Sequence, residues 1–210
     1  MEKGEVYESL RSKIITNTLR PGEILNEKDL IARYGIGRTP LRDVLFKLQE
    51  EKLIKTIPRL GSMVTPMDMA EMRELVEVRR ELEGFAAHLA AERIVPKQLK
   101  ALRRILQGAT EQFREEQEVD NVSNYFDTQF HHTLYEAACN GKLVDILQKM
   151  HVQMLRLWFS LGFKTIRFAS QAESLYALLE AVERHDGAAA RDAMQNHIDM
   201  YAARLKEKFL

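Results

Sequence analysis

The chain has 210 residues, and its 31 Lys and Arg balance 31 Asp and Glu, so its formal net charge at pH 7 is zero. A composition of 45% hydrophobic and 30% charged residues excludes disordered and fibrous classes and allows one large or two small domains. The single cysteine, Cys139, excludes an intramolecular disulfide. With no apolar run after the charged N-terminus and none long enough for a membrane span, we expect a cytoplasmic protein.

The charge is divided unevenly along the chain. Residues 1–66 carry 12 Lys and Arg against 9 Asp and Glu, which leaves 19 against 22 for the remainder. A mildly basic first part on a mildly acidic body is compatible with nucleic acid bound at one end only. The excess is small, so it supports the motifs described next but would not carry the argument alone.

Two helices separated by a glycine turn are predicted between Asn26 and Glu51. Asn26 is a favoured N-cap, and Gly35 can supply the positive φ that ends a helix. Thr39 then caps the second helix, with Pro40 at its first position, where a missing N–H has no consequence. A preceding amphipathic helix is predicted over residues 5–18. This order is typical of a helix-turn-helix.

The second of these helices begins with two arginines. The free N–H groups of its first turn favour phosphate, and the guanidinium groups of Arg38 and Arg42 can pair with guanine in the major groove. The alternative is a solvated helix end in which Arg42 pairs with Asp43 or its neighbours. The next segment decides between them.

A short β-hairpin is predicted directly after the second helix. Leu53–Ile57 and Met63–Val64 read as strands, and Pro58–Gly61 as their turn. Such a hairpin forms a wing, and Arg59 at its tip lies beside a glycine that allows close approach to a nucleic-acid backbone.

The stretch from Pro21 to Val64 resembles the winged-helix domain of the GntR family of bacterial transcription regulators. The residues that carry the resemblance are Pro21-Gly22, Leu25, Glu27, Leu30, Arg38-Thr39-Pro40, Arg42, Leu45, Leu48 and Gly61. It implies that operator DNA is contacted by Lys28, Arg38, Thr39, Arg42 and Gly61, to which the hairpin argument adds Arg59. Gly37 departs from the family, which usually has serine or threonine there, and this implies one phosphate hydrogen bond fewer.

The rest of the chain shows only helical patterning. Asp68 with Glu71 has the form of a capping box and opens a long helix through about Ile94. Five more helices are predicted over residues 97–116, 121–138, 142–161, 171–184 and 188–208. We therefore predict a mostly α protein in two parts: a winged helix-turn-helix domain of three helices and a hairpin over 1–66, and an all-α bundle of about six helices over 67–210.

The segment Val78–Ile94 resembles the opening helix of the FCD effector domain, the helical C-terminal domain of one GntR subfamily. That resemblance implies a divalent metal inside the bundle, held by an Asp and a His one helical turn apart and by two later His. Asp127 and His131 have the required spacing on one helix face, and His197 matches the last ligand. Leu175 stands where the remaining histidine is expected. His151 could substitute, but its spacing does not require it.

Two interpretations of this cluster stay open. Three ligands can hold Zn²⁺, Ni²⁺ or Mn²⁺ with water or an effector carboxylate in the open positions. Alternatively, Asp127 and His131 form a buried polar pair that binds an organic effector without metal. The residues expected to contact the effector are Arg79, Asp127, His131, Arg156 and His197. Arg79 could equally form a structural ion pair with Glu83, one turn on.

The favoured function is a ligand-responsive regulator. The resemblance and the geometry of DNA half-sites imply a homodimer on a pseudo-palindromic operator, with a small carboxylate or sugar acid in the bundle changing DNA affinity. The alternative is a metal-dependent hydrolase or other enzyme built on the helical part. No nucleophile and base stand at useful spacing, and a winged helix would be idle in such an enzyme, so we expect a regulator.

Overall fold

The computed structural model describes residues 1–114, 122–160 and 168–209, which form two compact units. One unit contains Met1–Met69 together with the part of the chain that starts at Val152 in helix α7 (Gly141–Ser160). The other contains Ala70–His151 and the C-terminal helices. The described residues form nine helices and one three-stranded antiparallel sheet, which confirms the predicted mostly α fold.

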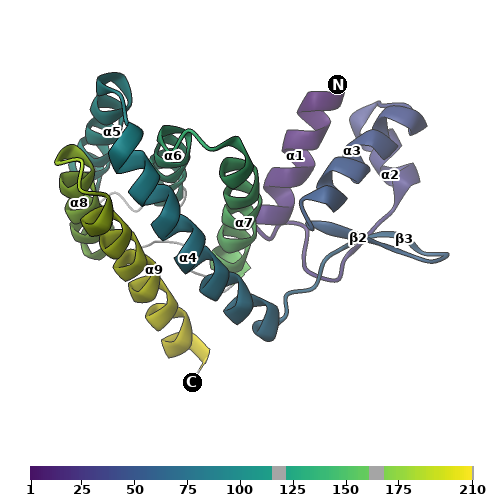
Figure 1. Cartoon of the computed structure of the whole chain (residues 1–210). Coiled ribbons are helices and arrows are strands. Elements are labelled where there is room, and N and C mark those ends of the chain that lie inside the picture. Colours follow the sequence, from purple (N-terminus) through teal and green to yellow (C-terminus); the bar gives the residue numbers. More distant parts are fainter. Residues whose placement is uncertain (115–121, 161–167, 210) are drawn as a thin grey trace. The chain divides into compact units, whose positions relative to one another are not determined.

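Three helices and the sheet build the first unit (Figure 1). The helices are α1 (Lys3–Ile15), α2 (Glu27–Tyr34) and α3 (Arg38–Glu50). Helix α1 ends earlier than predicted, because the chain turns at Thr16 and Asn17, the latter with a φ of 60°. The predicted cap of α2 is confirmed: the Asn26 side chain accepts a hydrogen bond of 2.9 Å from the Lys28 amide. Gly35 closes α2 in the left-handed conformation, with a φ of 59°.

The predicted start of α3 is wrong by two residues. Gly37, in an extended conformation, is the N-cap and makes no side-chain cap, so Arg38 is the first helical residue and Thr39 the second. The first amides of a helix have no partner inside it, so Pro40 is tolerated as the third helical residue as well as at the first. The correction places Arg38 inside the first turn of α3.

The sheet has the order β1-β3-β2, from β1 (Ile24–Leu25), β2 (Ile54–Ile57) and β3 (Gly61–Val64). The predicted hairpin is β2 and β3, in a register that pairs Ile57 with Gly61. Strand β1 was not predicted, because two residues are too few to show an alternating pattern. It holds the outer edge of β3 through pairs such as Ile24 with Met63.

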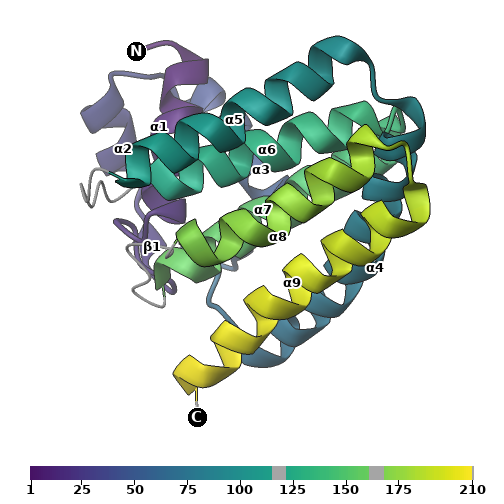
Figure 2. The same ribbon diagram turned by 90° about the vertical axis from the view of Figure 1, so that its left-hand side faces the viewer.

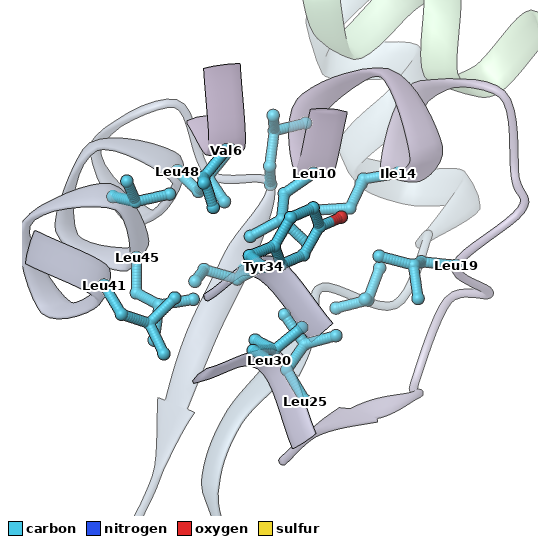
Figure 3. Packing of buried hydrophobic residues seen from close by; sticks show 14 of the residues in the cluster. Val6, Leu10, Ile14, Leu19, Leu25, Leu30, Tyr34, Leu41, Leu45 and Leu48 are labelled. Atoms are coloured by element: carbon cyan, nitrogen blue, oxygen red, sulfur yellow. The ribbon is translucent and has the colours of Figure 1, made fainter. Parts of the chain in front are cut away.

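A single apolar core holds the first unit together (Figure 3). The predicted face of α1 is buried in it, as are the inward residues of α2 and α3: Val6, Leu10, Ile14, Leu30, Tyr34, Leu41, Val44, Leu45 and Leu48. Val152 of α7 belongs to the same cluster, and Leu155 and Phe159 pack against it. Truncating one of the fully buried leucines to alanine would cost about 2–5 kcal/mol. Such a core fixes α3 and the wing relative to each other.

The second unit is a helical bundle. Besides the first half of α7, it contains α4 (Met69–Arg93), α5 (Pro96–Arg114), α6 (Val122–Ala137), α8 (Phe168–Glu183) and α9 (Gly187–Phe209). Each predicted helix is found, although the predicted break at 162–169 falls largely outside the described residues. Figure 2 shows α8 and α9 side by side. None of the helices described is both long and apolar enough to cross a bilayer.

Helices α4 and α9 contact each other through polar side chains near the surface of the bundle. Arg80 of α4 pairs with Asp199 of α9 at 2.9 Å. Gly187 begins α9 against the ring of His88, where an added Cβ would lie 2.6 Å from Nδ1. Only glycine permits this approach without a shift of the histidine.

Candidate DNA interface and metal centre

The leading edge of α3 is exposed and basic. Arg38, Thr39 and Arg42 all face solvent, as does Lys28 on α2. One interpretation paired Arg42 with Asp43, but in the structure the nearest carboxylate partner of Arg42 is Glu27. Its Nε lies 3.8 Å from the Glu27 carboxylate, and its side chain is 67% exposed. An exposed pair at this distance is weak, so the guanidinium can leave it for a stronger acceptor.

The wing tip presents a second cation on a tight turn. The Leu60 amide donates to the Ile57 carbonyl at 3.1 Å, so Pro58 and Arg59 are the central residues of a β-turn. Arg59 has a φ of 65°, at a turn position that favours glycine. Gly61, with a φ of 98°, then returns the chain to β3. A left-handed arginine is disfavoured by about 1–2 kcal/mol, and such strain is typical of functional positions.

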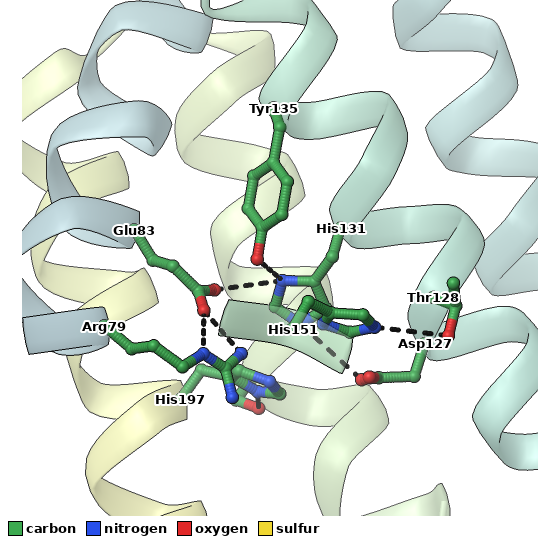
Figure 4. Close-up of polar contacts among 9 residues, drawn as sticks. Arg79, Glu83, Asp127, Thr128, His131, Tyr135, His151 and His197 are labelled. Atoms are coloured by element: carbon green, nitrogen blue, oxygen red, sulfur yellow. Dashed lines mark hydrogen bonds and ion pairs between the residues drawn. The ribbon is translucent and has the colours of Figure 1, made fainter. Parts of the chain in front are cut away.

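The other candidate site is a network of polar side chains inside the helical bundle (Figure 4). Five helices contribute to it: Arg79 and Glu83 from α4, Asp127, Thr128, His131 and Tyr135 from α6, His151 from α7, Ser174 from α8 and His197 from α9. Each of α4 and α6 places its polar residues one turn apart, so they share a face. We call this set the histidine cluster.

The base of the histidine cluster is a buried chain of charges. Arg79, 3% exposed, donates to Glu83 through Nε and Nη2, and Glu83 is fully buried. The second Glu83 oxygen lies 3.0 Å from Nδ1 of His131. The Tyr135 hydroxyl lies 3.3 Å from the same nitrogen. Of the two interpretations of Arg79, the structure therefore shows the ion pair with Glu83.

Three potential metal ligands converge above this base. The donor atoms of Asp127, His131 and His197 all lie within 4.8 Å of one another. Nε2 of His131 faces the Asp127 carboxylate at 3.6 Å. Nδ1 of His197 is 2.9 Å from the Ser174 hydroxyl, which leaves its Nε2 for another partner.

The charges of this network set the protonation of its members. Burial opposes the charged form of Glu83, but Arg79 and His131 outweigh it and lower the pKa to about 2. Burial also opposes charge on His131, yet Asp127 and Glu83 raise its pKa to about 9. The pKa of Asp127 falls well below its usual range, because the His131 charge outweighs burial. Without a metal, the network is balanced by two cations and two carboxylates.

The remaining two imidazoles are neutral. Burial, reinforced by the charge on His131, lowers the pKa of His151 to about 3 and that of His197 to about 4. A neutral imidazole carries a lone pair and is the form that binds metals. Both rings are thus in the protonation state that a metal requires.

The residues present fit a divalent metal. Asp127, His131 and His197 offer the oxygen and nitrogen donors that Zn²⁺ and Ni²⁺ accept, and their mutual distances suit a single ion after small adjustments. Metal-bound histidines usually donate their second N–H to a carboxylate, and Glu83 is in that place for His131.

One predicted site residue lies elsewhere, and one expected ligand position is apolar. Leu175 of α8, where the resemblance implies a histidine, is 1% exposed and packs in the apolar core of the bundle. Arg156, predicted to bind the effector, lies in the part of α7 that joins the first unit, and its Nη2 donates to the Thr65 carbonyl. Burial lowers the pKa of Arg156 to about 10. Among the described contacts, Arg156 takes no part in the histidine cluster.

Sequence reasoning missed three members of the cluster. Tyr135 lies one helical turn after His131, so its spacing could have revealed it. Thr128 and Ser174 contact histidines on other helices, and no signal in the sequence marks such contacts.

Comparison with known proteins supports both halves of this description. The model described as "Bacterial regulatory proteins, gntR family" matches residues 2–64, and the model of the FCD domain matches residues 74–200. The HTH-type transcriptional repressor RspR of Escherichia coli (strain K12) is 28% identical over 200 residues, which cover 92% of this chain and 84% of RspR. A probable D-xylose utilization operon transcriptional repressor of Paenarthrobacter nicotinovorans is 25% identical, over 94% of this chain and 85% of that protein.

A solved structure shows the same fold. E. coli McbR/YncC superposes with a TM-score of 0.81 and 22% identity, over 99% of this chain and 98% of that one. A winged helix with a cationic leading edge, followed by a helical domain with a buried polar site, defines a DNA-binding transcription regulator and not an enzyme. The chain belongs to the GntR family of bacterial regulatory proteins, with an FCD domain as its C-terminal part.

Proposed function

We propose that this regulator binds a pseudo-palindromic operator as a homodimer and releases it when a small carboxylate or sugar acid occupies the histidine cluster. The geometry of α3 carries the first half of the proposal. Arg38 lies in the first turn of a helix whose free amides favour phosphate, Arg42 follows one turn later, and both are exposed. One arginine can then pair with a guanine edge while the helix terminus fixes the register on the backbone.

The wing would add a second anchor. Arg59 is exposed at the tip of the β2–β3 hairpin. Strand β3 pairs with β2 on one side and with β1 on the other, which fixes the hairpin in the sheet. A cation there can reach a phosphate or the minor groove beside the α3 contact. Lys28, at the start of α2, would contribute a further phosphate contact.

In the helical domain, we propose that Asp127, His131 and His197 hold Zn²⁺, Ni²⁺ or Mn²⁺. The bound ion would supply a Lewis-acidic anchor for the effector's carboxylate. Arg79 would take a smaller part in binding the effector, because its Nε and Nη2 both contact Glu83. The name of the relative from P. nicotinovorans, which refers to D-xylose utilization, supports an effector derived from a sugar.

Control of DNA binding requires that the effector distinguish two states of the dimer. A ligand shifts an equilibrium only by its difference in affinity for the two arrangements. We propose that the loaded form binds operator more weakly. The name of RspR, a transcriptional repressor, supports the further proposal that the operator-bound form represses.

The decisive experiment compares the double variant Arg38→Ala/Arg42→Ala with the natural protein, using fluorescence anisotropy on upstream promoter DNA at several salt concentrations. We expect a loss of about 1–3 kcal/mol per base-contacting arginine and a shallower dependence on salt. The double variant Lys97→Ala/Arg104→Ala removes the same charge from exposed positions of α5 and should bind normally. Equal affinity and equal salt dependence in both variants would contradict the proposed interface.

A further inference from the structure

His151 has one ring nitrogen with a partner and one without. Its Nε2 lies 3.2 Å from the Thr128 hydroxyl of α6. Its Nδ1 is buried and has no hydrogen-bond partner among the residues that the structure describes, while the residue as a whole is 2% exposed. A buried polar atom left without a partner is disfavoured by about 1–3 kcal/mol and needs an explanation.

The contact with Thr128 suggests which nitrogen carries the proton. If Nε2–H donates to the hydroxyl oxygen, Nδ1 holds a lone pair that faces no donor. An unsatisfied lone pair on a neutral imidazole is what a metal ion accepts. An outer partner that fixes the tautomer in this way is a usual feature of histidine ligands.

The positions of the rings agree with this interpretation. The ring centroids of His131 and His151 are 5.3 Å apart, and those of His131 and His197 are 5.5 Å apart. Two imidazoles bound to one ion at about 2.0–2.1 Å have their centroids about 5 Å apart. His151 therefore stands at the same spacing from His131 as the ligand candidate His197. Figure 4 shows the rings of His151 and His131 next to each other, in agreement with their centroid distance.

We propose that His151, through Nδ1, is a fourth protein ligand and replaces the imidazole that Leu175 no longer supplies from α8. This rests on the proposed metal-assisted effector site. Asp127, His131 and His197 already lie within 4.8 Å of one another. Coordination would draw Nδ1 of His151 towards them while Thr128 retains Nε2. The donor set of one carboxylate and three imidazoles suits Zn²⁺ and Ni²⁺, and a six-coordinate ion would keep two positions for a carboxylate effector.

The test counts imidazoles directly. In the full-length protein loaded with one Cu²⁺, electron spin echo envelope modulation reports how many imidazole rings bind the ion. We expect three in the natural protein and two in His151→Phe, which keeps a ring of similar size in the buried position. Competition with a chromophoric chelator should show at least about a tenfold loss of Zn²⁺ affinity in His151→Phe and a smaller loss in Thr128→Val. His88→Gln, a histidine that pairs with Glu92 outside the cluster, serves as control and should change neither measurement.

The outcomes separate the two proposals. Two imidazoles in both the natural protein and His151→Phe, with unchanged Zn²⁺ affinity in the variant, would overturn the role of His151 and leave the metal site of Asp127, His131 and His197 standing. A natural protein that competes for neither Zn²⁺ nor Cu²⁺ would overturn the metal site itself, and the role of His151 with it. Circular dichroism checks that His151→Phe folds. If it does not, the Zn²⁺ affinity of Thr128→Val is the test: a reduced affinity supports the role of His151, and an unchanged affinity contradicts it.

Discussion

The buried pair of Arg79 and Glu83 gives the sharpest prediction for stability. Replacing Glu83 by Gln keeps the size of the side chain but removes the only carboxylate that contacts Arg79 among the described residues. Arg79 is 3% exposed and cannot regain water without a rearrangement of α4. Leaving one partner of a buried pair uncompensated costs about 3–5 kcal/mol. His131 would also lose the carboxylate that faces its Nδ1.

Differential scanning calorimetry of the chelator-treated protein measures this effect. We expect the melting transition of the helical unit to fall by about 10 °C in Glu83→Gln. The double variant Arg79→Met/Glu83→Gln should recover most of that loss, because no unpaired charge remains. Glu77→Gln removes the partner of Arg73 at the same spacing on the same helix, but that pair is exposed, so the transition should stay in place. If Glu83→Gln melts with the natural protein, or the double variant melts lower still, the argument from the buried charge is refuted.

Three further outcomes follow from the structure. Arg59→Gly removes the strain of an arginine in the left-handed conformation and should stabilise the first unit by up to about 1 kcal/mol. The same variant should bind operator more weakly, with a salt dependence whose slope is smaller by about one. A less stable protein with normal DNA binding would count against this. Asn26→Ala removes the cap on the Lys28 amide, which should lower the free energy of unfolding by about 1 kcal/mol in urea titrations, and an unchanged midpoint would contradict it. The pKa of metal-free His131 is about 9, and a histidine must be neutral to bind a metal, so Zn²⁺ affinity should rise about tenfold per pH unit between pH 6 and 8. Calorimetric titrations measure this dependence, and an affinity that does not change with pH would rule out His131 as a ligand.

The helices could be predicted because their signals are local. Long periodic stretches and a single cap such as Asn26 specify a helix without reference to the rest of the chain. The start of α3 was misplaced because Pro40 is compatible with more than one position in a first turn. Strand β1 exists only because β3 lies beside it, so nothing within residues 24–25 announces it.

Only part of the histidine cluster could be predicted from local signals along the chain. Asp127 and His131 lie one turn apart on one helix, and their proximity follows from helical geometry. The contacts between helices are of another kind. The approach of Glu83 to His131 and of Ser174 to His197 depends on how the helices pack, which spacing along the chain does not encode.

The contribution of Val152 to the first apolar core has a consequence for dissecting the protein. A fragment cut after Met69 would carry all of α3 and the wing, yet it would lack the helical turn that covers part of the apolar interior. It would also lose the hydrogen bond that the Arg156 guanidinium donates to the Thr65 carbonyl. The core of the first unit is thus completed by residues more than eighty positions further along the chain. We expect a fragment that ends at Met69 to be less stable than the same residues are in the whole chain.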